Sequence, residues 1–181
     1  MVEYTTSGVD YFAEAAWLQC TLRTMNEPPV TVRPATNRDA SAVCELIFAI
    51  LHEYQLPPDP TGADADLDDI EANYFARGGR FDVLIDAGGS VVGTVGLYPI
   101  NDRTVELRKM YVHARERGKG HGLRLLNHAI ESARRLGFKR MTLETASQLK
   151  TAIDMYKRRG LRPMSGEIHV RRCDQAYEME L

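Results

Sequence analysis

Apolar residues recur at helical spacing in several stretches of this 181-residue chain. The clearest are residues 36–54, which open with the capping-type sequence TNRD, and residues 120–137, which end at a glycine. In the first stretch, the predicted buried face comprises Val43, Leu46, Ile47, Ile50 and Leu51. In the second, it comprises Leu123, Leu126, Ile130, Ala133 and Leu136. Two further helices are predicted at residues 66–79 and 148–160, each of which stops at a glycine.

Short runs rich in β-branched and aromatic residues predict strands between these helices. The predicted strands are residues 30–33, 81–86, 91–100, 104–112, 140–146, 166–172 and 176–181. The turn sequence AGGS separates the second strand from the third, which is typical of a hairpin. Strands joined partly by hairpins and partly by helical crossovers indicate a mixed β-sheet with helices, of the α/β or α+β class.

Residues 1–29 stand apart from this pattern. Residues 9–25 predict one helix, and the sequence NEPPV ends it because prolines cannot continue a helix. We therefore expect an N-terminal extension, residues 1–29, that packs on a single domain formed by residues 30–181.

Composition narrows the function classes. With 44% hydrophobic and 27% charged residues, the chain can bury an ordinary globular core. A net charge of −2 argues against a nucleic-acid binder, which is usually strongly basic. The sequence has no apolar run of about 18 residues that predicts a membrane span. Its first residues lack the features of a signal peptide, so we expect a cytoplasmic protein. The three cysteines and five histidines fit neither a disulfide framework nor a metal site.

A glycine-rich segment before the helix at 120–137 is the strongest sign of chemistry. Residues 115–122 read RERGKGHG. A helix N-terminus exposes unpaired N–H groups, and glycines let a phosphate approach them closely. The segment is not a P-loop, which needs Ser or Thr after Gly-Lys, and it lacks the GxGxxG spacing of dinucleotide-binding folds. It therefore predicts a phosphate or pyrophosphate site of another kind.

The stretch ELRKMYVHARERGKGHGLRLL, together with the later TAIDMYKRRGL, resembles the acetyl-CoA-binding region of the GNAT N-acetyltransferase superfamily. The family pattern Arg/Gln-x-x-Gly-x-Gly/Ala matches Arg117, Gly120 and Gly122. The resemblance covers residues 30–181 and implies a mixed, splayed, mostly antiparallel sheet flanked by helices. It also implies acetyl-CoA as co-substrate, without a metal, entering where two parallel strands part. The residues it assigns to the cofactor are Met110, Tyr111, Val112, Arg117, Gly118, Lys119, Gly120, His121, Gly122, Leu123 and Ala152.

The strand before the glycine-rich segment carries an irregular pattern. Val105 and Leu107 keep a period of two, and so do Met110 and Val112, but the pairs are out of phase by one residue. A β-bulge at residues 108–109 reconciles them, and the resemblance implies a bulge at this place. Free N–H groups around Met110 would then bind the thioester carbonyl and its oxyanion, and the pantetheine arm would pair with the strand.

Acetyl transfer to an amine needs a neutral amine, a stabilised oxyanion and a proton for the leaving thiolate. Tyr156 follows Ala152 by one helical turn and matches the tyrosine of the family motif, so it is the predicted proton donor. The alternative is a tyrosine that packs the helix on the sheet. Glu106 is the predicted base, because many family members carry an acidic residue there, or it pairs with a cation such as Arg108. Glu144 is the rival base.

The sequence defines the acceptor side less well. The resemblance places the acceptor pocket against the first two helices, their loop and the C-terminal strands. The acidic residues of that loop are Asp59, Asp64, Asp66, Asp68, Asp69 and Glu71. They fail the EF-hand spacing, and charging or capping of the next helix explains them better than a pocket for a polyamine or lysine. Tyr54, Tyr74 and Tyr98 line this pocket or belong to the core.

We therefore expect an acetyl-CoA-dependent N-acetyltransferase acting on a small-molecule primary amine. Two alternatives stay open: a protein N-terminal or lysine acetyltransferase, and a non-catalytic acyl-CoA-binding sensor. The expected partners are acetyl-CoA and the amine, without nucleic acid or membrane, and a homodimer is compatible with the sequence.

Overall fold

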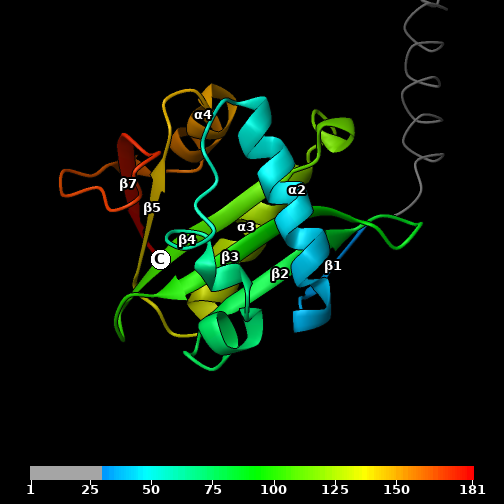
Figure 1. The fold of residues 1–181 in the computed structure, drawn as a ribbon. Coiled ribbons are helices and arrows are strands. Elements are labelled where there is room, and N and C mark those ends of the chain that lie inside the picture. The colour runs from blue at the N-terminus through cyan, green and yellow to red at the C-terminus, as the bar shows by residue number, and fades with distance from the viewer. Residues whose placement is uncertain (1–29) are drawn as a thin grey trace, which may run out of the picture.

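The computed structural model describes residues 30–181, and the helix expected at 9–25 lies outside these residues. Seven strands form one sheet (Figure 1). They are β1 (Thr31–Pro34), β2 (Arg80–Ile85), β3 (Val91–Pro99), β4 (Thr104–Val112), β5 (Arg140–Thr145), β6 (Arg162–Pro163) and β7 (Gln175–Glu180). Their order across the sheet is β1-β2-β3-β4-β5-β7-β6, and every neighbouring pair is antiparallel except β4 and β5. The predicted mixed sheet and its β2–β3 hairpin are confirmed.

The α-helices cover both faces of this sheet. They are α2 (Ala40–Glu53), α3 (His121–Arg135) and α4 (Lys150–Arg158), and α2 and α3 lie on opposite faces (Figure 1). Each face buries its own cluster of apolar side chains, one under α3 and α4 and the other under α2. All five residues predicted for the apolar face of α2 are buried, because this helix lies flat across the sheet.

The buried face predicted for α3 is confirmed in the middle of the helix and is wrong at both ends. Leu126, Ile130 and Ala133 are buried, whereas Leu123 and Leu136 are 46% and 45% exposed. Leu123 lies in the first turn of the helix and Leu136 is its C-cap, so both lie where the sheet no longer covers the helix.

The helix predicted at residues 66–79 is replaced by two short turns, a 3-10 turn at Ala65–Leu67 and a π-helical turn at Glu71–Phe75. The carboxylate of Asp69 accepts the N–H of Ala72 at 2.9 Å, so the second turn begins only there. Gly78, with φ of 80°, then ends it. Side-chain hydrogen bonds to the backbone therefore prevent the continuous helix that the apolar pattern of residues 66–79 predicts.

The strand predicted at residues 166–172 is also wrong. Its N–H groups at His169 and Val170 donate to the carboxylate of Glu144 instead of to a neighbouring strand. The N–H of Cys173 closes a turn on the Val170 carbonyl at 2.8 Å. This loop packs beside β5, and β6 forms earlier in the chain than the pattern predicts.

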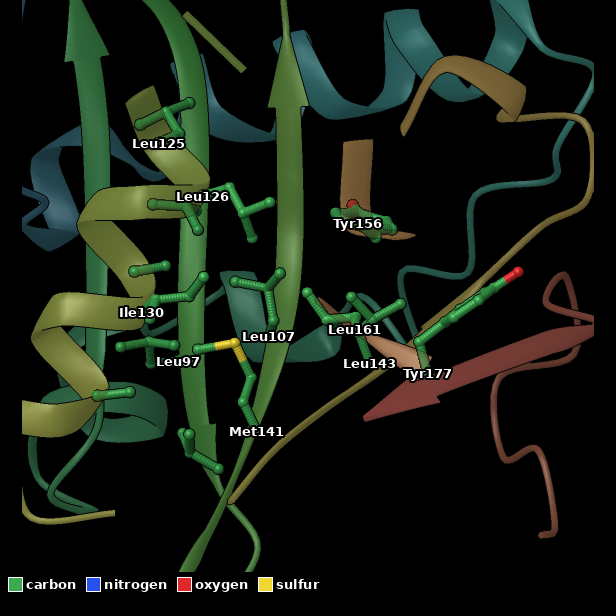
Figure 2. Close-up of a cluster of buried hydrophobic side chains, with 14 of the residues drawn as sticks. Leu97, Leu107, Leu125, Leu126, Ile130, Met141, Leu143, Tyr156, Leu161 and Tyr177 are labelled. Carbon is green, nitrogen blue, oxygen red and sulfur yellow. The ribbon is translucent and has the colours of Figure 1, made fainter. Parts of the chain in front are cut away.

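The splay of β4 and β5 positions the candidate site. Their parallel pairing covers only Thr104–Glu106 on β4, opposite residues 140–142 on β5. Beyond Glu106 the strands diverge, and Tyr156 of α4 lies at the opening, near Leu107 and Leu143 (Figure 2). Within residues 30–181, β4 therefore has an edge without a strand partner from residue 107 onward.

Candidate active site

The bulge predicted in β4 is present and centred on Lys109. The register with β3 shifts between Thr94 and Gly96, whose partners are Tyr111 and Arg108. Lys109 has φ of 52°, a left-handed conformation that is uncommon for residues with a side chain. Its carbonyl accepts a hydrogen bond of 2.6 Å from the Thr94 hydroxyl, so the irregular backbone is fixed inside the sheet.

The bulge distributes the side chains of β4 between the two faces of the sheet. Val105 and Leu107 are buried in the core under α3, and Met110 and Val112 pack against the same core. Tyr111 packs against the core under α2. The out-of-phase pattern in the sequence follows from this arrangement, because one extra residue lets both apolar pairs face α3.

The glycine-rich segment leads from β4 into the N-terminus of α3. Gly118 and Gly120 have φ of 77° and 84°, which glycine adopts without strain. Five residues here have N–H groups that donate to no group within residues 30–181: Gly118, Gly120, His121, Gly122 and Leu123. They lie at the positive end of a 15-residue helix, which makes the segment a suitable anion site.

Gly122 has no comparable conformational need, since its φ is not left-handed. A Cβ at this position would come no closer than 3.6 Å to the sulfur of Met155 on α4, an ordinary contact. By contrast, a Cβ at Gly96 would lie 2.8 Å from a ring carbon of Tyr74. Packing within the described residues therefore explains Gly96 but not Gly122, whereas close approach of a ligand to the backbone does explain it.

The side chains of the segment are mostly engaged with the protein. Arg117 Nε donates to the Val112 carbonyl at 2.9 Å, and its guanidinium forms an ion pair with Glu53 at the end of α2. Lys119 lies 3.1 Å from Glu116. Because neighbouring carboxylates balance these charges, the backbone N–H groups are the better-suited anion donors of this segment. Leu123, also predicted to contact the cofactor, lines a hollow of about 630 Å³ beside β1.

Tyr156 lies on α4 beside the splay (Figure 2), and Ala152 lies one turn earlier on the same helix. Tyr156 is 6% exposed, and burial raises the pKa of its phenol. Its hydroxyl lies 4.0 Å from the sulfur of Met110, the residue that follows the bulge. The fold thus brings the predicted proton donor, protonated at neutral pH, to the predicted thioester site.

Glu106 lies on the other face of β4, in an ion pair with Arg108. Its Oε2 accepts hydrogen bonds from Arg108 Nε at 2.8 Å and Nη2 at 2.6 Å. Its Oε1 accepts none from the described residues. Tyr98 of β3 lies directly opposite Glu106, and the Arg108 guanidinium lies 4.0 Å from the centre of its ring. The predicted base is therefore at the splay, and the alternative pairing with Arg108 also occurs.

A buried charge cluster holds the bulge from the α2 side. Lys109 Nζ lies 2.6 Å from Asp64 Oδ1 and 3.2 Å from Asp66 Oδ1. Arg172 donates to both oxygens of Asp64, at 2.8 and 2.7 Å. Burial alone would raise the pKa of Asp64, but the two cations more than offset it and lower that pKa.

The acidic loop is therefore more than a helix cap. Asp69 does cap a helical turn through its hydrogen bond to Ala72. Asp64 and Asp66 instead neutralise buried cations, and Asp66 also accepts the Tyr74 hydroxyl at 2.6 Å. Tyr74 is a fully buried core residue. The sequence missed this cluster because its members are far apart in the chain, although a lysine between two apolar pairs is itself an unusual signal.

Glu144, the rival base, fastens the C-terminal loop. It accepts the N–H groups of His169 and Val170 and lies 2.9 Å from the His169 ring. Burial tends to raise the pKa of Glu144, but these hydrogen bonds outweigh it and hold the pKa below its usual range. A carboxylate so engaged is a weaker base than one with a free oxygen.

Metal sites and membrane-spanning helices are both absent from residues 30–181. This part of the chain contains no group of three or more His, Cys, Asp or Glu side chains that could hold a metal ion. None of its helices is both long and apolar enough to cross a membrane.

Comparisons with known proteins agree with this geometry. Residues 45–161 match the model of the acetyltransferase (GNAT) family. Over 134 residues, the chain is 37% identical to the uncharacterized N-acetyltransferase YjgM of Escherichia coli, covering 71% of this chain and 80% of that protein. A GNAT-family acetyltransferase of Staphylococcus aureus has a TM-score of 0.79 at 23% identity, covering 84% of this chain and 99% of that one.

Two similar structures contain acetyl-CoA. One is yncA of Salmonella typhimurium, solved with its cofactor acetyl-CoA, with 28% identity and a TM-score of 0.63, covering 84% of this chain and 94% of that one. The other is a phosphinothricin acetyltransferase of Sinorhizobium meliloti, with 23% identity and a TM-score of 0.66, covering 84% of this chain and 88% of that one.

Proposed function

The chain belongs to the GNAT acetyltransferase family and is an N-acetyltransferase, and from this premise we propose that it acetylates the primary amine of a small molecule by direct attack within a ternary complex. The observation that carries the proposal is the meeting of three features at one opening in the sheet. These are the bulged edge of β4, the unpaired N–H groups at the start of α3, and Tyr156.

Acetyl-CoA supplies a thioester whose carbonyl carbon is open to attack by an amine. The five unpaired N–H groups at the start of α3 suit its pyrophosphate, and Gly122 leaves room for the pantetheine chain that follows the pyrophosphate. The unpaired edge of β4 near Met110 and Val112 suits the pantetheine amides, as an added strand would. N–H groups at the bulge are the candidate oxyanion donors.

Glu106 and Tyr156 complete the chemistry from opposite faces of β4. The free Oε1 of Glu106 takes the proton of the attacking amine, directly or through a water. The new C–N bond forms as the C–S bond breaks, and the Tyr156 hydroxyl gives its proton to the departing thiolate. Glu144 is the weaker candidate for the base because its oxygens are occupied.

A small acceptor fits the acceptor side better than a protein chain. Lys109 and Arg172 both bind Asp64, so ion pairs fasten the two loops that flank this side to the bulge. Loops held in place in this way favour a compact amine over a long protein chain. One structural neighbour is a phosphinothricin acetyltransferase, which gives the same indication.

A thiol-release screen tests the proposal. The full chain is mixed with acetyl-CoA and a library of primary amines, amino acids, peptides and small proteins, and free coenzyme A is measured. Release with small amines at a rate above hydrolysis is expected. Release only with peptides or proteins would overturn the small-molecule assignment, and no release with any amine would contradict catalysis.

A further inference from the structure

Three carboxylates on the acceptor side of the splay each face a cation of the protein. Asp64 and Asp66 face Lys109, Asp64 also faces Arg172, and Glu106 faces Arg108. In each case the carboxylates are already neutralised by buried or half-buried cations of the protein. Asp64, Asp66 and Glu106 therefore offer no spare negative charge to a polyamine or to a second ammonium group.

Positive charge, in contrast, is left over beside the base. The Arg77 guanidinium lies 4.8 Å from the centre of the Tyr98 ring, and Arg108 lies 4.0 Å from it. Arg77 forms no ion pair within residues 30–181, and Nη1 of Arg108 comes no closer than 3.8 Å to Asp66. Three of these four cations are paired with a carboxylate, so Arg77 is the one left without an ion pair within residues 30–181.

The position of this charge relates it to the reaction. Tyr98 lies directly opposite Glu106 across β3 and β4, and Glu106 is the last residue of β4 that pairs with β5. Arg108 is two residues further, with its side chain 28% exposed. A guanidinium therefore lies beside the candidate base, at the point where the sheet opens.

We propose, resting on the acetyl transfer proposed above, that the acceptor is a primary amine that also carries a carboxylate, as an amino acid does. Arg108 binds the acceptor carboxylate through Nη1. Arg77, whose guanidinium also contacts the Tyr98 ring, contributes a second positive charge. A guanidinium suits this role because its planar donors can serve two carboxylates at once. Arg108 then holds Glu106 and the acceptor side by side, which places the amine near Glu106 Oε1.

Matched acceptors test this proposal on the full chain. Each amino acid of a panel is compared with its own carboxamide, so that the amine and side chain stay the same. The measurement is kcat/KM from coenzyme A release at saturating acetyl-CoA, expressed per concentration of neutral amine. The acids should exceed their amides on the order of ten- to a hundredfold, the range of a hydrogen bond between charged groups.

Variants then test which residues cause the preference for acids over amides. Arg108→Gln should bring the acid-to-amide ratio to about one, Arg77→Gln should lower it severalfold, and Arg134→Gln on exposed α3 should leave it unchanged. Thermal unfolding checks that each variant is folded. If Arg108→Gln does not fold, the proposal requires that Arg77→Gln lower the acid-to-amide ratio.

The proposal is overturned if the wild-type protein accepts amides as readily as acids, or if folded Arg108→Gln keeps the ratio. It is equally overturned if Arg77→Gln is without effect when Arg108→Gln fails to fold. Failure of the proposed function looks different, because no primary amine of either kind would then release coenzyme A.

Discussion

Lys109 Nζ lies 2.6 Å from Asp64 Oδ1, which ties the bulge of β4 to a loop 45 residues earlier in the chain. The lysine side chain is only 4% exposed, and the aspartate carboxylate is fully buried. The same nitrogen donates to the Ala63 carbonyl. A left-handed backbone at Lys109 is thus supported by its own side chain, and the bulge and the acceptor-side loop form one unit.

Lys109→Met tests this unit. It leaves Asp64 buried with Arg172 as its one cationic partner among the described residues, so the free energy of unfolding should fall by about 3 kcal/mol. Urea denaturation measures the loss. The exposed Lys139→Met is the control and should change stability by less than about 0.5 kcal/mol. Equal stability of the two variants would contradict a structural role for the buried pair.

A substitution at Gly122 tests whether this glycine is needed for ligand binding rather than for packing. Gly122→Ala should leave the free energy of unfolding unchanged or slightly raised, because the position is helical and open. Its affinity for acetyl-CoA in calorimetry should fall by about tenfold or more, since the Cβ keeps a phosphate from the backbone.

The control for this experiment is Gly96→Ala. Its Cβ would meet Tyr74 at 2.8 Å and Phe81 at 3.1 Å, so stability should fall by about 1–3 kcal/mol. Unaltered acetyl-CoA affinity in a stable Gly122→Ala or Gly122→Val variant would count against the predicted cofactor position.

Strands β2 to β4 could be predicted from sequence because they are consecutive runs rich in β-branched and aromatic residues. The bulge could be predicted because an extra residue at Lys109 shifts the period of two by one position along β4. The segment 166–172 was misread because its N–H groups bond to the side chain of Glu144, a partner that strand periodicity does not reveal.

Within the candidate site, the cofactor side was more predictable than the acceptor side. The glycine-rich segment is continuous in the chain, so its residues identify it. The proposed acceptor side comes from separate parts of the chain that meet only through the fold, namely Arg77, Tyr98, Arg108, Asp64 and Arg172. A sequence does not show which charged side chains are paired in the fold and which are free.

The contact between Glu144 and His169 should make the C-terminal loop sensitive to pH. The ion pair raises the pKa of His169, whereas hydrogen bonds from the loop, against the effect of burial, lower the pKa of Glu144. The histidine therefore stabilises the fold below its unfolded pKa of about 6.5, and this effect is lost as the pH rises through the raised value. The carboxylate contributes above about 4.3, and its effect is lost as the pH falls through the lowered value.

The measurement is the difference in melting temperature between wild type and His169→Ala. It should be largest between about pH 4.5 and 6.5 and should disappear by about pH 9. Glu144→Gln should abolish the pH dependence of that difference, because the charged partner is gone. A difference that stays constant from pH 5 to about pH 9 would show that the ring packs there without an ion pair.

Tyr156→Phe distinguishes a proton donor from a packing residue. Within residues 30–181 the hydroxyl forms one hydrogen-bond contact, with the Met110 sulfur at 4.0 Å, so its removal should cost less than about 1 kcal/mol of stability. Turnover should nevertheless fall on the order of a hundredfold, with unchanged acetyl-CoA affinity, because the thiolate leaves without its proton. Tyr177→Phe is the matched control, since Tyr177 is buried in the same core and its hydroxyl bonds to Gln175 at 2.7 Å. That variant should lose stability but keep turnover, and a Tyr156→Phe enzyme with wild-type turnover would assign Tyr156 to packing.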